Sequence, residues 1–174
     1  NYGRTEDIGF TPGNNLIRNN FSIGGNARLS NKLTASGVFN FVRTGFKSPP
    51  NAVSTGSGAA FNGGAIFGDI LYTPRSVDLT NLPFQAADGR SLYYRSGNDI
   101  QNPYWTVENS KTSQDTERFI GNMSLSYEFN DWMNLTYRLG LDSYTELNSY
   151  GQNKGGIDGP VLGILRTSAA RNSI

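Results

Sequence analysis

The chain has 174 residues, enough for one ordinary domain, and only 36% of them are hydrophobic. Its 15 basic and 14 acidic residues give a net charge of +1, so the charge balance does not indicate a nucleic-acid partner. There is no cysteine and no histidine, which excludes disulfides, thiolate metal sites, a cysteine nucleophile and histidine-dependent triads within this sequence. We therefore expect no enzyme, no cofactor and no metal site.

Residues 18–44 are predicted to form a first long hairpin. Apolar or small side chains alternate with polar ones, which is typical of a strand with two different faces. Asn31-Lys32 supplies the turn, and Val38 and Val42 interrupt the polar side of the second half. We expect strands at about residues 18–30 and 33–44. The side chains of their apolar face include Phe21, Ile23, Leu29 and Phe39.

Residues 45–117 are predicted to form one long loop. Residues 56–64 are small and rich in glycine, and we expect them to be flexible. A short helix is predicted over residues 64–72, capped by Asn62, because four apolar residues recur there at helical spacing. These four are Ile66, Phe67, Ile70 and Leu71.

Two aromatic pairs lie in the same predicted loop. They are Tyr93-Tyr94 and Tyr104-Trp105. Exposed aromatic rings stack well on sugars and on peptide side chains, so the four are candidates for contact with a substrate or a covering protein. Alternatively, they pack the loop against itself. Asp88-Gly89 predicts a turn, and the Asn102-Pro103-Tyr104-Trp105 stretch is interpreted as irregular.

A second long hairpin is predicted over residues 118–145. Strands at about residues 118–129 and 133–145 are joined at Asn130-Asp131, and residues 146–174 are predicted to form a second loop. The apolar face is again regular, and Trp132 and Phe129 lie beside the short turn, where aromatic residues suit a membrane interface. The side chains of the apolar face of this second hairpin include Phe119, Met123, Leu125, Tyr127, Leu135, Tyr137 and Leu139.

Strand length favours a membrane over a soluble sheet. A twelve-residue strand spans about 40 Å. Tilted by about 45°, it projects to about 28 Å, close to the hydrocarbon thickness of a bilayer. Short turns at one end and long loops at the other are typical of outer-membrane barrels. We therefore expect an all-β fold, an antiparallel transmembrane β-barrel segment whose apolar face meets lipid. The alternative is a soluble sheet packed on an ordinary core.

The opposite face carries charges that would be costly in lipid, so we expect it to line a wet or plugged lumen. Its charged and amide side chains either pair with one another or with an interior plug, or contact a transported solute. These residues are Arg28, Arg118, Asn122, Glu128, Arg138 and Asp142. Asp142 and Glu146 alone do not make a calcium site.

Several stretches resemble one family. They are Asn102-Pro103-Tyr104-Trp105-Thr106, Arg118-Phe119-Ile120-Gly121-Asn122, Tyr127-Glu128-Phe129-Asn130-Asp131-Trp132 and Leu139-Gly140-Leu141-Asp142. In order and spacing they resemble the SusC/RagA-type TonB-dependent transporters of Bacteroidota outer membranes. The resemblance is strong over residues 102–144 and weaker elsewhere.

The resemblance implies a multi-pass outer-membrane barrel of about 22 strands with a plugged lumen. Such proteins import oligosaccharides or peptides, driven through TonB, and a SusD-like lipoprotein covers the barrel as a lid. Neither the plug nor the TonB-contacting segment is found in these residues, so we expect this chain to be a piece of a longer protein. The short turns then face the periplasm and the loop after residue 44 faces outward.

Three other interpretations stay open. The first is a SusC-like barrel that serves as a scaffold in a larger outer-membrane complex without transporting. The second is a soluble all-β binding or adhesion module. The third is an outer-membrane barrel enzyme, which would need a histidine from outside this sequence.

Overall fold

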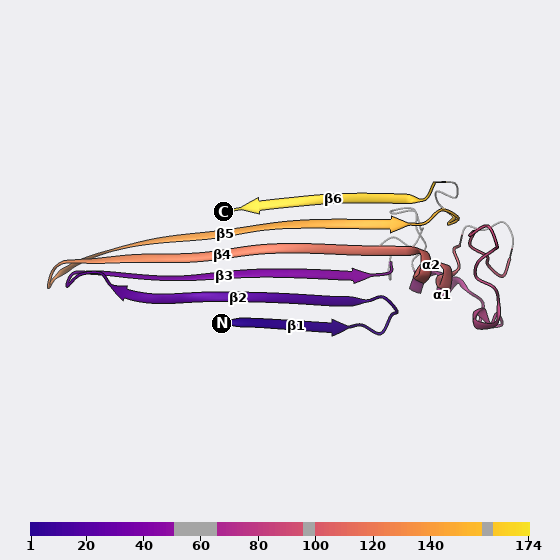
Figure 1. The fold of residues 1–174 in the computed structure, drawn as a ribbon, viewed down its shortest axis with the longest axis horizontal. Helices are drawn as coiled ribbons and strands as arrows, with labels where there is room; N and C mark the ends of the chain where they lie inside the picture. Colours follow the sequence, from indigo (N-terminus) through magenta and orange to yellow (C-terminus); the bar gives the residue numbers. More distant parts are fainter. Residues whose placement is uncertain (51–65, 96–99, 158–161) are drawn as a thin grey trace.

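The computed structural model describes residues 1–50, 66–95, 100–157 and 162–174. Six antiparallel strands form one sheet in the order β1-β2-β3-β4-β5-β6, so that each strand pairs with its neighbours in sequence (Figure 1). The strands are β1 (Tyr2–Ile8), β2 (Asn15–Arg28), β3 (Leu33–Ser48), β4 (Ser110–Asn130), β5 (Met133–Gln152) and β6 (Ile164–Ser173). The predicted all-β, antiparallel class is confirmed. The sheet is open, with β1 and β6 as its edges.

The two predicted short turns are confirmed and lie at the same end of the sheet (Figure 1). Between β2 and β3, Leu29 N donates to Leu33 O at 2.8 Å and Arg28 Nη2 donates to Asn31 O at 2.7 Å. Between β4 and β5 the turn consists of Asp131 and Trp132, and a register shift between Glu128 and Asn130 leaves Phe129 without a partner on β5. All longer connections lie at the other end.

The predicted lengths of the strands are wrong. β4 has 21 residues and β5 has 20, and they continue past the predicted limits at residues 118 and 145. The predicted loops 45–117 and 146–174 are correspondingly shorter, and the second contains β6. β1 was also not predicted. In all these stretches polar side chains occupy both faces of the strand, so the alternation that reveals a half-apolar strand is missing.

The connection between β3 and β4 contains α1 (Ile66–Tyr72), the 3-10 helix η1 (Leu79–Asn81) and α2 (Pro103–Asn109). The helix predicted at residues 64–72 is confirmed over Ile66–Tyr72. Its predicted cap Asn62 and the flexible residues 56–64 lie outside the described residues. No helix in the described ranges is long and apolar enough to span a membrane.

The expectation of irregular structure at Asn102-Pro103-Tyr104-Trp105 is wrong, because α2 begins there. The Oδ1 atom of Asn102 accepts a hydrogen bond from Tyr104 N at 3.0 Å, which caps the helix. Pro103 occupies the first turn, where its missing N–H costs nothing. An Asn-Pro pair ahead of a helix was the available signal.

Burial is confined to one end of the molecule. Among the described residues, the buried large hydrophobic side chains are Ile66 and Trp105, and both lie in the helical connection. The described part of the sheet has no apolar core of its own, and one of its faces exposes large apolar side chains from the short turns to the middle of the strands. No described residue covers that face.

Candidate functional site

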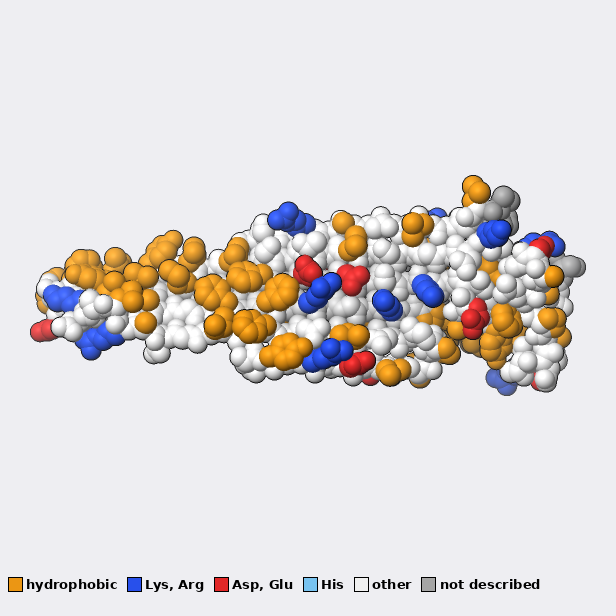
Figure 2. All heavy atoms as spheres, viewed as in Figure 1, with side chains coloured by type: hydrophobic (Ala, Val, Ile, Leu, Met, Phe, Trp, Pro, Cys, Tyr) orange, Lys and Arg blue, Asp and Glu red, His pale blue; other side chains and the backbone are white. Residues whose placement is uncertain are grey.

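The apolar side chains of β2–β5 align into one surface, which we call the apolar band (Figure 2). The strand register places Ile23 beside Phe39, and Leu125 between Ala35 and Tyr137. The exposed members of the band include Phe21, Ile23, Phe39, Met123, Tyr127, Leu135, Tyr137 and Leu139, while Phe119 and Leu125 are half-buried. The predicted apolar face therefore exists as one continuous patch.

The apolar band has two distinct ends. At the end away from the short turns, the register aligns four aromatic rings across the strands, from Tyr2 through Phe21 and Phe41 to Phe119. The next row outward on the same face is charged. At the turn end, Trp132 is 81% exposed and Leu29 also projects into solvent. The face thus changes from apolar to charged within a single row of residues.

Aromatic rings fill the gaps that glycines leave in the apolar band. A Cβ atom placed on Gly121 would lie 3.1 Å from the ring of Phe39, so that ring covers the bare backbone of the neighbouring strand. Phe39 also stacks on Phe119, with ring centroids 6.1 Å apart. Covering a strand glycine with an aromatic ring stabilises the sheet where no side chain is available.

All six residues predicted to line a lumen lie on the face opposite the apolar band, as their positions in the strand register require. Two of them are joined: Arg118 donates from Nε and Nη2 to both carboxylate oxygens of Asp142, at 2.9 and 2.5 Å. Arg28 instead donates to backbone oxygens of its own turn. The others, Asn122, Glu128 and Arg138, are not brought together with them.

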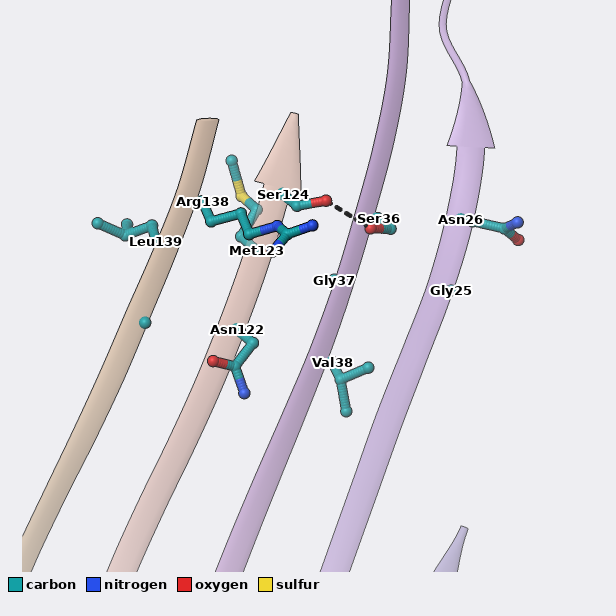
Figure 3. Close-up of a pocket in the computed structure, with 11 residues that line it drawn as sticks. Gly25, Asn26, Ser36, Gly37, Val38, Asn122, Met123, Ser124, Arg138 and Leu139 are labelled. Carbon is teal, nitrogen blue, oxygen red and sulfur yellow. Dashed lines mark hydrogen bonds between the residues drawn. The ribbon is translucent and has the colours of Figure 1, made fainter. Parts of the chain in front are cut away.

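A shallow depression of about 370 Å³ lies in this polar face (Figure 3). Gly140 has no side chain on this face, which keeps the surface low there. Gly25 and Gly37 line the depression with backbone, because their positions in the register belong to the apolar band. Arg138 extends from β5 toward the hydrogen bond between Ser36 and Ser124, whose oxygens are 2.9 Å apart. The remaining lining residues are Asn26, Val38, Asn122, Met123 and Leu139. One arginine among amides and hydroxyls can donate to carboxylate or sugar oxygens.

The loops at the other end are held together by a buried polar core around α2, which we call the loop core. Trp105 is 0% exposed and donates from Nε1 to Gly89 O at 2.9 Å. Asn102 donates from Nδ2 to Leu92 O at 2.8 Å, and Gln101 accepts from Ile157 N at 3.0 Å. Three segments distant in sequence are therefore joined through amide side chains. Reasoning from the sequence missed this role.

The four aromatic residues expected to contact a ligand or a covering protein have different environments. The prediction is wrong for Trp105, which is fully buried because its indole fills the loop core. Tyr93 and Tyr94 contact each other, with centroids 4.5 Å apart, and the hydroxyl of Tyr93 lies 2.6 Å from that of Thr73. Tyr104 is 42% exposed and packs near Phe84. Tyr104 is thus the most accessible of the four.

The predicted turn at Asp88-Gly89 is confirmed and forms part of the loop core. Gly89 N donates to Ala86 O at 2.9 Å, and Gly89 has a φ of 87°, a conformation that favours glycine. The backbone amide of Arg90 donates to Asp88, which lowers the pKa of that carboxyl. The carbonyl that this turn presents is the acceptor for Trp105.

One buried carboxyl in α1 has no counter-charge. The Oδ2 atom of Asp69 has no hydrogen-bond partner among the described residues, and burial raises the pKa of this carboxyl to about 7. Asp69 is one of the buried residues of α1, the helix that packs against α2.

The comparisons with known proteins supply no identity. No protein-family model and no curated protein matches this chain. Within the described ranges, no group of three or more acidic side chains is placed to hold a metal ion. Any functional assignment therefore depends on the two faces of the sheet and on the loops.

Proposed function

We propose that this chain is part of the barrel of an outer-membrane importer of oligosaccharides or peptides. In this proposal the importer is of the SusC/RagA type, takes up its solute with energy from TonB, and works with a SusD-like surface lipoprotein. The plug and the TonB contact would be supplied by parts of the protein outside these 174 residues.

The apolar band is the observation that carries the proposal. From Phe119 to Phe129 the strand advances about 34 Å, which becomes about 25 Å at a tilt of 40°. An outer-membrane barrel carries an apolar belt of about 25 Å bounded by aromatic residues. Leaving such side chains in water forgoes about 1.5–3 kcal/mol each relative to burial, so a lipid environment suits this face better than an aqueous one.

The two edges of the sheet favour a larger barrel. β1 and β6 each pair on one side only, so their outer N–H and C=O groups have no strand partner among the described residues. In lipid an unsatisfied backbone group costs several kcal/mol, and closure removes the edges. Further strands of the same protein are the simplest partners.

The remaining candidate residues are assigned by their positions. Arg28, Arg118, Asn122, Glu128, Arg138 and Asp142 lie opposite the apolar band, where they face the lumen and its plug. Tyr104, together with Tyr93 and Tyr94, lies among the loops at the far end, where the lid or an incoming solute arrives. Trp105 is excluded from this second group because it is buried.

The proposal is tested on the native polypeptide. Membranes are extracted with detergent, and the protein containing this sequence is characterised by intact mass and peptide mapping. We expect a chain near 100 kDa or more with a plug upstream, which co-purifies with a SusD-like lipoprotein. A free 19 kDa chain that stays in solution without detergent contradicts the proposal and favours the soluble binding module.

Uptake measurements separate import from the scaffold alternative. Cells that lack the protein should lose growth on an oligosaccharide or peptide source, and the gene for the full chain should restore it. Unchanged uptake, with stable partner proteins in the same extract, favours a scaffold in a larger outer-membrane complex.

A further inference from the structure

Three arginines lie in one transverse row on the face that carries the apolar band. The strand register aligns this row as Arg4, Asn19, Arg43, Glu117, Thr145 and Arg171, one residue from each of the six strands. At about 4.8 Å between strands, Arg4 and Arg43 are about 10 Å apart, and Arg43 and Arg171 about 14 Å. Together with Glu117, the row has a net charge of +2.

The arginine row follows the aromatic row directly. Tyr2 and Phe41 are two residues nearer the short turns than Arg4 and Arg43 on the same strands, so these two arginines directly follow an aromatic side chain. On β6 the equivalent position before Arg171 is Ser173. Figure 2 shows this change from apolar to charged side chains on one face. The described residues at the turn end of the band include no comparable set of arginines on this face.

We propose that the arginine row binds the phosphates of anionic lipid headgroups in the membrane leaflet next to the long loops. The inference rests on the proposed membrane function of the apolar band. Guanidinium groups bind phosphate through paired N–H donors and are more weakly hydrated than ammonium groups. Their long side chains reach sideways along the surface while the charged end stays at the headgroup level.

The row keeps donors available for this purpose. Arg4 lies 3.4 Å from Glu6, and Arg43 lies 3.5 Å from Glu117, and all four side chains are about half exposed or more. Exposed ion pairs of this length contribute little stability and do not saturate a guanidinium. Arg171 makes no ion pair within the described residues. The spacing of the arginines suits several lipid molecules side by side and not one small anion.

The test measures the lipid composition next to the row in the full-length protein. Ser143, on the aromatic row beside Phe119, is replaced by cysteine in a background otherwise without cysteine, and carries a fluorophore. The protein is reconstituted in phosphatidylcholine vesicles containing brominated phosphatidylglycerol or brominated phosphatidylcholine. We expect the anionic lipid to quench more strongly, with a preference of about fivefold for each arginine that contacts a headgroup.

Substitutions then assign the preference to these side chains. The triple variant Arg4→Gln, Arg43→Gln, Arg171→Gln should lower the preference to near one. The matched control removes the same charge elsewhere, with Arg18→Gln and Arg166→Gln on the opposite face and Arg90→Gln in the loops. It should keep the preference.

Three results overturn the inference. Equal quenching by both lipids in the unaltered protein, or equal loss of preference in both triple variants, contradicts a specific headgroup site but leaves the membrane assignment intact. Absence of quenching by either lipid shows that the apolar band does not contact lipid, and the proposed function then fails together with the inference.

Discussion

The sheet and the loop core differ in where their apolar and polar side chains find partners. The sheet leaves large apolar side chains exposed on one face, and no described residue covers them. The loop core buries Trp105 completely and provides an internal partner for its amide side chains. The apolar side chains of the sheet are therefore exposed, whereas the side chains of the loop core are packed and hydrogen-bonded within it.

The largest predicted effect tests whether the loop core is self-sufficient. Replacing Trp105 by alanine removes a fully buried indole and its hydrogen bond to Gly89, which should cost about 3–5 kcal/mol of local stability. Hydrogen exchange of the amides in residues 84–92 and in α2 should accelerate strongly, while the amides of β2–β5 stay protected.

Tyr104→Ala is the matched control on the same helix. Its ring is 42% exposed, so hydrogen exchange of the loop should change far less. Equal acceleration in both variants would mean that the indole is not what holds the three segments together.

A second substitution tests the environment of the sheet. Arginine in place of Leu139 puts a charge in the middle of the apolar band, and should cost about 2–4 kcal/mol if the band meets lipid. Thr136→Arg puts the same side chain on the opposite face and should cost little. Urea unfolding of the full-length protein in phospholipid vesicles measures both. Equal costs would show that the two faces meet the same medium.

Asp69 predicts a pH dependence that is confined to the loop core. Its folded pKa of about 7 lies above the 3.8 of the unfolded chain, so folding takes up a proton between these values. The packing of α1 on α2 should be most stable below about pH 4, weaken as the pH rises to 7, and stay constant above it. A rise in pKa from 3.8 to about 7 corresponds to a loss of at most about 4 kcal/mol.

Hydrogen exchange of α1 and α2 between pH 4 and 8, corrected for the intrinsic rates, measures this change. Asp69→Asn keeps the shape of the side chain and should make the stability independent of pH. A pH dependence that survives in Asp69→Asn would assign the effect to another group.

The smallest predicted effect concerns the polar face. Arg118 and Asp142 form a two-point ion pair, yet their side chains are 49% and 39% exposed. In water such a pair contributes little to stability, because solvent screens the two charges. A double-mutant cycle with Arg118→Gln and Asp142→Asn measures the coupling energy in the full-length protein, which should be small. A large coupling energy would indicate that a plug covers the pair and removes it from water.

The same contrast explains what sequence could predict. Alternation revealed the four central strands, their faces and both short turns, because apolar residues on one face alternate with polar residues on the other along them. It failed at residues 110–117, where Lys111, Asp115 and Glu117 alternate with equally polar neighbours. Both faces of the strand are polar there, so no pattern marks the strand. β1 and β6 were missed for the same reason.

The loop core was not predictable from pattern at all. Gln101 and Asn102 are buried because they satisfy backbone groups from segments far away in sequence, such as Ile157 N and Leu92 O. Only the Asn102-Pro103 pair carried a local signal, as a helix cap. The arginine row likewise depends on the register of all six strands. Its first and last arginines, Arg4 and Arg171, are 167 positions apart in the sequence.

The polar halves of β4 and β5 also determine how far the loop core lies from the apolar band. From Phe119 to Ser110 the strand advances nine residues, about 30 Å along its axis and more than 20 Å upward at a barrel-like tilt. A headgroup layer is only about 5–7 Å thick. In a membrane, the loop core would therefore stand on a stalk well clear of the lipid. A solute, lid or antibody that docks there would approach from open solvent and make no contact with the bilayer.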